Sequence, residues 1–169
     1  MPKERTRDLI CPPWTLDIPR IGCWILIVGK AIVQDRYGSV DVLELREIEK
    51  PEIGNDEVLV RVHAAGVDPR VWHLMTGLPY LVRVMGFGFR APKARVRGTD
   101  VAGSVEAVGA NVTRFRPGDA VFGTCDGSFA EYASAKEQHL VAKPGNLSFE
   151  QAAAVPTSAL TERRPFSSL

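Results

Sequence analysis

The segment that decides the fold covers residues 57–77 and reads EVLVRVHAAGVDPRVWHLMTG. Three valines between positions 58 and 62 alternate with other residues, which is the period of a strand with one buried face. Asp68 and Pro69 suit the N-cap and the first position of a helix. Gly77 suits the end of that helix. The sequence therefore predicts a strand that leads directly into a short helix.

Short strand-like stretches separated by glycine-rich turns flank this segment on both sides. Strands are expected at residues 30–35, 40–48, 99–108, 120–122, 128–133 and 139–142. Residues 148–151 read as a capping box that opens a second short helix through Ala154. Many short strands and few helices predict a mainly β fold, a barrel or a sandwich, with one or two short helices.

Length and composition limit the possible functions. The chain has 169 residues, 45% of them hydrophobic and 24% charged, which is typical of one globular domain. Its 21 Lys and Arg against 20 Asp and Glu give a net charge of +1. This balance argues against a nucleic-acid binder that depends on charge. A membrane partner is not expected either, because the apolar run at 21–28 is far shorter than the roughly 20 residues of a membrane helix.

Cysteine content points to a reducing compartment. The three cysteines, at positions 11, 23 and 125, show no CxxC spacing. Neither a disulfide framework nor a structural zinc site is expected from such a set. No signal peptide is recognisable, so we expect a cytoplasmic protein.

Two local patterns have an ordinary and a functional interpretation. Residues 86–91 fit GxGxxA, the dinucleotide fingerprint, but no strand–helix context accompanies them, so a glycine-rich loop is the preferred interpretation. A basic cluster with aromatic neighbours is compatible with single-stranded nucleic acid, but a solvated loop is the commoner meaning. The cluster comprises Arg83, Arg90, Lys93, Arg95 and Arg97.

Asp68 and His73 are the candidate catalytic residues. They lie five residues apart at the start of the same predicted helix, where a carboxylate and an imidazole could serve as acid–base groups. The competing interpretation is that Asp68 is simply an N-cap. His63 falls among apolar strand residues and is expected to be structural. No histidine or cysteine has zinc-ligand spacing, so no metal site is expected.

Five motifs, in this order and spacing, resemble the medium-chain dehydrogenase/reductase superfamily. They are EVLVRVHAAGV at 57–67, RGTDVAG at 97–103, VGANVTRFRPGDAVFG at 108–123, GSFAEY at 127–132 and LSFEQAAA at 147–154. The resemblance covers residues 30–161. It implies the N-terminal catalytic domain of these enzymes, a GroES-like β-barrel, without the Rossmann domain that binds the cofactor.

The resemblance also implies a zinc-independent chemistry. Zinc-dependent alcohol dehydrogenases resemble this chain but have a cysteine at the position of Asp68 and a histidine at that of Thr99. The quinone-oxidoreductase-like branch is a closer match. It implies NADPH, or NADH, as the cofactor and a small quinone, enone or carbonyl compound as the substrate. The branch commonly has asparagine at position 68 and can have tyrosine at 73, and it has a threonine near the cofactor at Thr161.

Similarity to the superfamily stops at both ends of the chain. We expect residues 1–29 to be an irregular leader and residues 162–169 to be a tail foreign to the family, as in a truncated or frame-shifted product. Such a chain is expected to be inactive alone and to hold no cofactor tightly. The alternative is a non-catalytic barrel that acts as a binding module or is an inert remnant. The sequence leaves the oligomeric state open.

Overall fold

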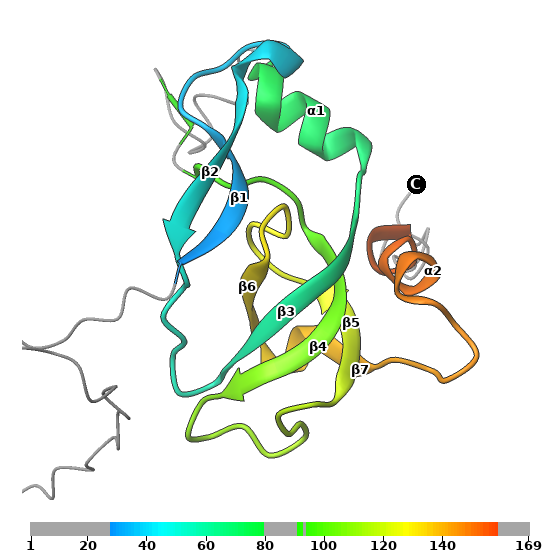
Figure 1. The fold of residues 1–169 in the computed structure, drawn as a ribbon. Coiled ribbons are helices and arrows are strands. Elements are labelled where there is room, and N and C mark those ends of the chain that lie inside the picture. Colours follow the sequence, from blue (N-terminus) through cyan, green and yellow to red (C-terminus); the bar gives the residue numbers. More distant parts are fainter. Residues whose placement is uncertain (1–27, 80–90, 93, 159–169) are drawn as a thin grey trace, which may run out of the picture.

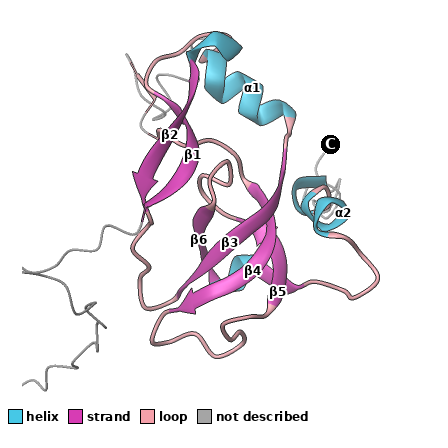
Figure 2. Ribbon diagram, viewed as in Figure 1, coloured by secondary structure: helices cyan, strands magenta, loops and turns pink. Residues whose placement is uncertain are grey.

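The computed structural model describes residues 28–79, 91–92 and 94–158. Its elements in chain order are β1 (Val28–Gln34), β2 (Leu43–Glu49), β3 (Glu57–Gly66), α1 (Pro69–Thr76), β4 (Asp100–Val108), β5 (Ala120–Thr124), β6 (Tyr132–Lys136), β7 (Leu140–Ala142) and α2 (Phe149–Ala153) (Figure 1). The predominance of strands confirms the mainly β fold with two short α-helices (Figure 2). None of the helices in these residues is long and apolar enough to cross a lipid bilayer.

The strands form two antiparallel sheets. Five strands follow the order β6-β3-β4-β5-β7, and β1 pairs with β2 as a separate hairpin. Isolated bridges join this hairpin to the rest of the molecule, at Ala31 with Ala130 and at Val33 with Val96. The hairpin and α1 lie together at one end of the molecule, and α2 packs against β3, β4 and β5 (Figure 1).

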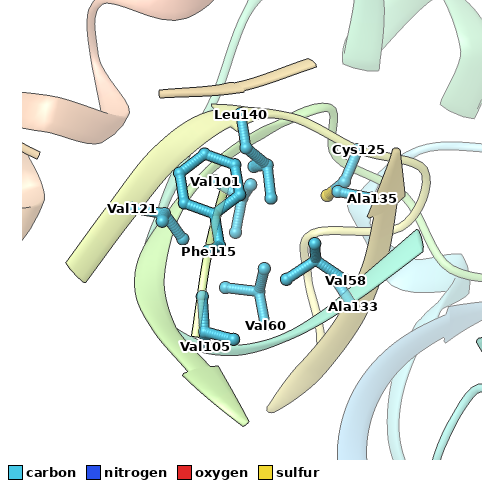
Figure 3. Packing of buried hydrophobic residues seen from close by; sticks show 10 residues of the cluster. All are labelled: Val58, Val60, Val101, Val105, Phe115, Val121, Cys125, Ala133, Ala135 and Leu140. Carbon is cyan, nitrogen blue, oxygen red and sulfur yellow. The ribbon is translucent and has the colours of Figure 1, made fainter. Parts of the chain in front are cut away.

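The core lies inside the curved five-stranded sheet. Val58 and Val60 are fully buried, as the alternation in their strand predicts. They pack with residues of the other four strands and with Phe115, so the strands close around one apolar centre (Figure 3). Gly103 allows β3 and β4 to approach, because a side chain there would overlap the backbone carbonyl of Arg61.

Both predicted helices form with their expected caps. The Asp68 carboxylate accepts a hydrogen bond from the backbone amide of Val71, and Gly77 ends α1 with a φ of 64°. In α2 both hydrogen bonds of the capping box between Ser148 and Gln151 are present.

Two predicted strands begin later than expected. Residues 40–42 of the predicted strand 40–48 form a 3₁₀ helix, and β2 begins at Leu43. Strand β6 begins at Tyr132, whereas the sequence predicts a strand at 128–133. The backbone of Phe129, which precedes β6, forms hydrogen bonds with two other segments of the chain. The Phe129 carbonyl accepts from the Ile32 amide at 2.8 Å, and the Phe129 amide donates to the Arg97 carbonyl at 2.9 Å. Gly127, with a φ of 81°, turns the chain toward these partners and away from the sheet.

Several sequence expectations fall outside the described residues. These are most of the leader, residues 86–90 of the glycine-rich pattern, the basic residues Arg83, Arg90 and Lys93, and Thr161 with the tail. Strand β1 begins at Val28, two residues before the expected start of the domain.

Candidate functional site

A cluster of polar side chains forms where β3 ends and β4 begins. The two strands are antiparallel, and Gly66 pairs with Asp100. This register places Asp68, two residues beyond β3, close to Thr99, which immediately precedes β4. The Thr99 hydroxyl donates to the Asp68 Oδ2 atom at 3.0 Å.

The chain beyond α2 completes the cluster. The Thr157 hydroxyl donates to the Asp100 Oδ1 atom at 2.6 Å. Arg70, on the first turn of α1, donates from Nη2 to the Thr157 Oγ1 atom at 3.4 Å, and the same nitrogen lies 3.6 Å from the Asp68 Oδ2 atom. We call Asp68, Arg70, Thr99, Asp100 and Thr157 the Asp68 cluster. Three separate segments of the chain thus meet in one network.

The two carboxyl groups of this cluster have opposite electrostatic environments. Burial disfavours the charged form of Asp68, but hydrogen bonds from Thr99 and from the Val71 amide outweigh it, so its pKa lies below the usual value. Burial raises the pKa of Asp100, which is only 3% exposed, and the hydrogen bond from Thr157 offsets this only in part. Asp68 is therefore an acceptor-only carboxylate at neutral pH.

Two cavities border the Asp68 cluster. A wide groove of about 980 Å³ lies between the end of β3 and α2, and its walls include Asp68, Asp100 and Thr157. A smaller cavity of about 330 Å³ lies between α1 and the loops at 94–99 and 126–127, and its walls include Arg70 and Thr99. Since Asp68 bonds to Thr99 and Arg70 bonds to Thr157, the cluster lies where the two cavities meet.

The smaller cavity has a mostly apolar wall. Val71 and Leu74 contribute from α1, and Ala94 and Val96 face them from the loop. Its volume is at the lower end of the range for small-molecule sites, which is about 300–1,000 Å³. It suits one flat, apolar molecule of small size.

His73 lies apart from the Asp68 cluster. Its Nδ1 atom is 2.9 Å from the Leu78 carbonyl oxygen, and its ring meets Trp72 edge-on at 5.1 Å. Because a carbonyl only accepts, Nδ1 carries the hydrogen, and the neutral ring presents Nε2 as an acceptor. His73 is not among the residues that line either cavity described above. The structure thus brings Asp68 into the site but does not place His73 in contact with it.

His63 also borders the groove, on the side of α2. Its ring stacks on Phe149 with centroids 4.5 Å apart, and Nε2 lies 3.1 Å from the Ser104 hydroxyl. These contacts join β3 to α2 and β4. They give His63 a structural part in holding the groove wall.

Sequence reasoning missed four members of the Asp68 cluster as site residues. Asp100 and Thr99 belong to the RGTDVAG motif, which marked the family but assigned them no role. Arg70 directly follows the Asp-Pro helix start, where a long cation can reach back to the cap. Thr157 follows α2 and carries no local signal.

A metal site is not formed by the residues that the structure describes. No three His, Cys, Asp or Glu side chains are grouped closely enough among them to hold an ion. The Thr99 hydroxyl hydrogen is directed to Asp68, and neutral hydroxyls are poor zinc ligands compared with His, Cys and carboxylate groups.

Comparisons with known proteins agree on one family. The family described as the alcohol dehydrogenase GroES-like domain matches residues 54–145. A chloroplastic quinone-oxidoreductase homolog from Spinacia oleracea is 37% identical over 130 residues, which cover 73% of this chain and 37% of the relative. A 2-methylene-furan-3-one reductase from Solanum lycopersicum is 37% identical over 139 residues, covering 74% of this chain and 33% of the relative.

A solved structure shows the same arrangement of strands. The Escherichia coli quinone oxidoreductase, crystallised in complex with NADPH, aligns with a TM-score of 0.67 and 25% identity. The alignment covers 78% of this chain and 38% of that one. This chain therefore spans well under half of the length of the relatives it matches.

Proposed function

Because this chain belongs to the alcohol dehydrogenase GroES-like domain family, in the zinc-independent quinone-oxidoreductase-like branch of the medium-chain dehydrogenase/reductase superfamily, we propose that it is the catalytic-domain part of an NAD(P)H-dependent reductase of quinones and activated alkenes. The observation that carries the proposal is the position of the Asp68 cluster, between a wide groove and a small apolar cavity. A reductase of this kind needs adjoining places for a cofactor and for an acceptor.

The residues of the wide groove fit a nicotinamide ring. Its floor is built from the small residues Ala64, Ala65 and Gly66, and Ala153 and Ala154 line the facing wall. Val67 at its edge is 80% exposed, which leaves apolar surface that a flat ring can cover. These residues would hold the ring, and the nicotinamide would supply a hydride when bound.

The smaller cavity would hold the acceptor. Its mostly apolar walls suit a quinone or enone, and Thr99 and Arg70 are the polar groups that line it on the side of the wide groove. The ionised Asp68 fixes both of them, through the hydrogen bond from Thr99 and the charge of Arg70. The part played by this chain is thus to orient the acceptor against the cofactor and to polarise it.

The proposal is tested by acceptor binding. We expect phenanthrenequinone to bind the purified chain saturably, as measured by quenching of tryptophan fluorescence. Leu74→Trp fills the smaller cavity and should weaken this binding at least about tenfold, whereas Val141→Trp, at an exposed position of β7, should not. Equal binding by both variants would contradict the proposed acceptor site. Absence of any quinone binding by the folded chain would favour a non-catalytic barrel.

A further inference from the structure

Arg70 lies where the two cavities meet. Its side chain is 60% exposed and lines the smaller cavity. Its Nη2 atom contacts Thr157 and lies near Asp68, which both line the wide groove. A guanidinium carries five N–H donors in a planar fork, and these two contacts involve a single nitrogen.

The hydroxyl hydrogens of the Asp68 cluster are directed at carboxyl groups. Thr99 donates to Asp68, and Thr157 donates to Asp100. The ionised Asp68 has no hydrogen to donate. None of these three side chains therefore offers a hydrogen to an acceptor oxygen.

The charges around the proposed acceptor site also favour a cation at the acceptor oxygen. Asp126 lines the proposed acceptor site and Asp68 lies beside it, bonded to Thr99, so both carboxyl groups repel any negative charge that develops there. Arg97 also lines this cavity, but its guanidinium already donates to the Gln34 side chain and to the Leu74 carbonyl. Among the described residues, Arg70 is the cation within 4 Å of the Asp68 carboxylate. A reduction that places negative charge on an oxygen needs a cation close to that oxygen.

We propose that Arg70 contacts the carbonyl oxygen of the acceptor and stabilises the negative charge that develops on it. This inference rests on the proposed function. In that reaction the acceptor gains a hydride, which brings two electrons, from NADPH, which becomes NADP⁺. The acceptor oxygen takes up the negative charge, and a proton that comes from the solvent then neutralises it. Arg70 stays protonated throughout, since a guanidinium does not release its proton in proteins.

The test uses 4-nitrophenol, whose ionised form carries an oxyanion and absorbs visible light. The purified chain is titrated with the probe over a range of pH, and the absorbance reports the ionisation of the bound molecule. We expect the wild-type chain to prefer the phenolate over the neutral phenol by about tenfold or more, as a charge-assisted hydrogen bond predicts. Arg70→Met should abolish this preference and still bind the neutral phenol. Arg70→Lys should retain part of it.

Arg61→Met is the matched control, because Arg61 is exposed on β3 and lines neither of the two cavities. It should preserve the preference for the phenolate. An unchanged preference in Arg70→Met would overturn the inference and leave the acceptor site in place. A wild-type chain that binds phenanthrenequinone but shows no preference for the phenolate would also overturn the inference. A chain that binds neither compound would overturn the proposed function and this inference with it.

Discussion

Asp68 and Asp100 belong to one hydrogen-bonded network, yet the protein affects their ionisation in opposite ways. The hydrogen bonds to Asp68 hold its pKa below 3.8, so its carboxylate stabilises the folded state above pH 3.8, and this stability is lost as the pH falls through the lower folded-state pKa. Burial raises the pKa of Asp100 above 3.8. Ionisation of Asp100 therefore lowers the free energy of unfolding. This loss is absent below pH 3.8, and it is complete above the raised pKa.

Substitution by asparagine should change the free energy of unfolding in opposite directions at the two positions. At pH 7 we expect Asp100→Asn to raise the free energy of unfolding, because it removes a buried charge and keeps an oxygen that accepts from Thr157. Asp68→Asn should lower it. Urea unfolding at pH 7, 5 and 3 measures both effects, and the gain from Asp100→Asn should vanish toward pH 3. A loss of stability in Asp100→Asn at pH 7 would show that the Asp100 charge is compensated.

His73 is the second candidate catalytic residue, and its role stays a prediction. Its Nε2 atom can donate a proton only from the charged imidazolium, because Nδ1 already carries the hydrogen directed to Leu78. In an enzyme that joins this domain to a dinucleotide-binding domain, we expect His73→Phe to lower quinone or enone reduction by on the order of 100-fold, as for loss of a general acid. Trp72→Phe is the neighbouring control. An unchanged rate in His73→Phe would remove this residue from the site.

At the scale of elements, α1 depends on two buried side chains from distant segments. Arg97 donates from Nε to the Gln34 Oε1 atom at 2.9 Å and from Nη2 to the Leu74 carbonyl at 3.1 Å. Gln34 donates in turn to the Met75 carbonyl at 2.6 Å. These carbonyls belong to the last turn of α1, where the backbone carbonyls have no hydrogen-bond donor within the helix. Arg97 and Gln34 thus fix the end of the helix that carries Arg70.

Arg97→Met should therefore destabilise the protein by about 3 kcal/mol, because it leaves the Gln34 oxygen and the Leu74 carbonyl without their donor in a buried place. Urea unfolding measures the change, and amide hydrogen exchange should show the largest loss of protection in α1. Arg95→Met is the control. Arg95 is 63% exposed in an ion pair with Asp35, and solvent screens such a pair, so its loss should change the stability little. Equal effects of the two substitutions would contradict the capping role.

The elements that local rules describe could be predicted from the sequence. Strand β3, the Asp68 and Gly77 caps of α1 and the capping box of α2 each rest on neighbouring residues, and all of them formed. The alternation in β3 is incomplete, because Leu59 is buried between Val58 and Val60. The site could be predicted only in part. Its hydrogen bonds join residues 31, 57 and 87 positions apart, so strand register and the packing of α2 decide which side chains meet. The shift of β6 has the same cause, since Phe129 pairs with segments far away in the chain.

At the scale of the whole molecule, the five-stranded sheet encloses a single core that includes a thiol. Cys125 is 8% exposed and packs with Val58 and other members of the core cluster. Burial, with a smaller effect of the nearby charges of Asp126 and Asp100, raises its pKa to about 12. The thiolate is the reactive form of cysteine. Access to this group therefore requires opening of the core.

Cys125 should react with a thiol reagent only when the molecule unfolds. Cys11 and Cys23 lie outside the described residues, so a variant with both changed to serine isolates Cys125. At pH 8 a pKa of about 12 leaves roughly one thiol in 10⁴ ionised, against about a quarter for an unperturbed cysteine. We expect native protein to react with DTNB at least about 10³-fold more slowly than urea-unfolded protein. The rate should rise along the same urea curve as the loss of β-sheet circular dichroism. Rapid reaction in the absence of urea would show that the sheet opens next to Cys125 without global unfolding, and the core would then not behave as one cooperative unit.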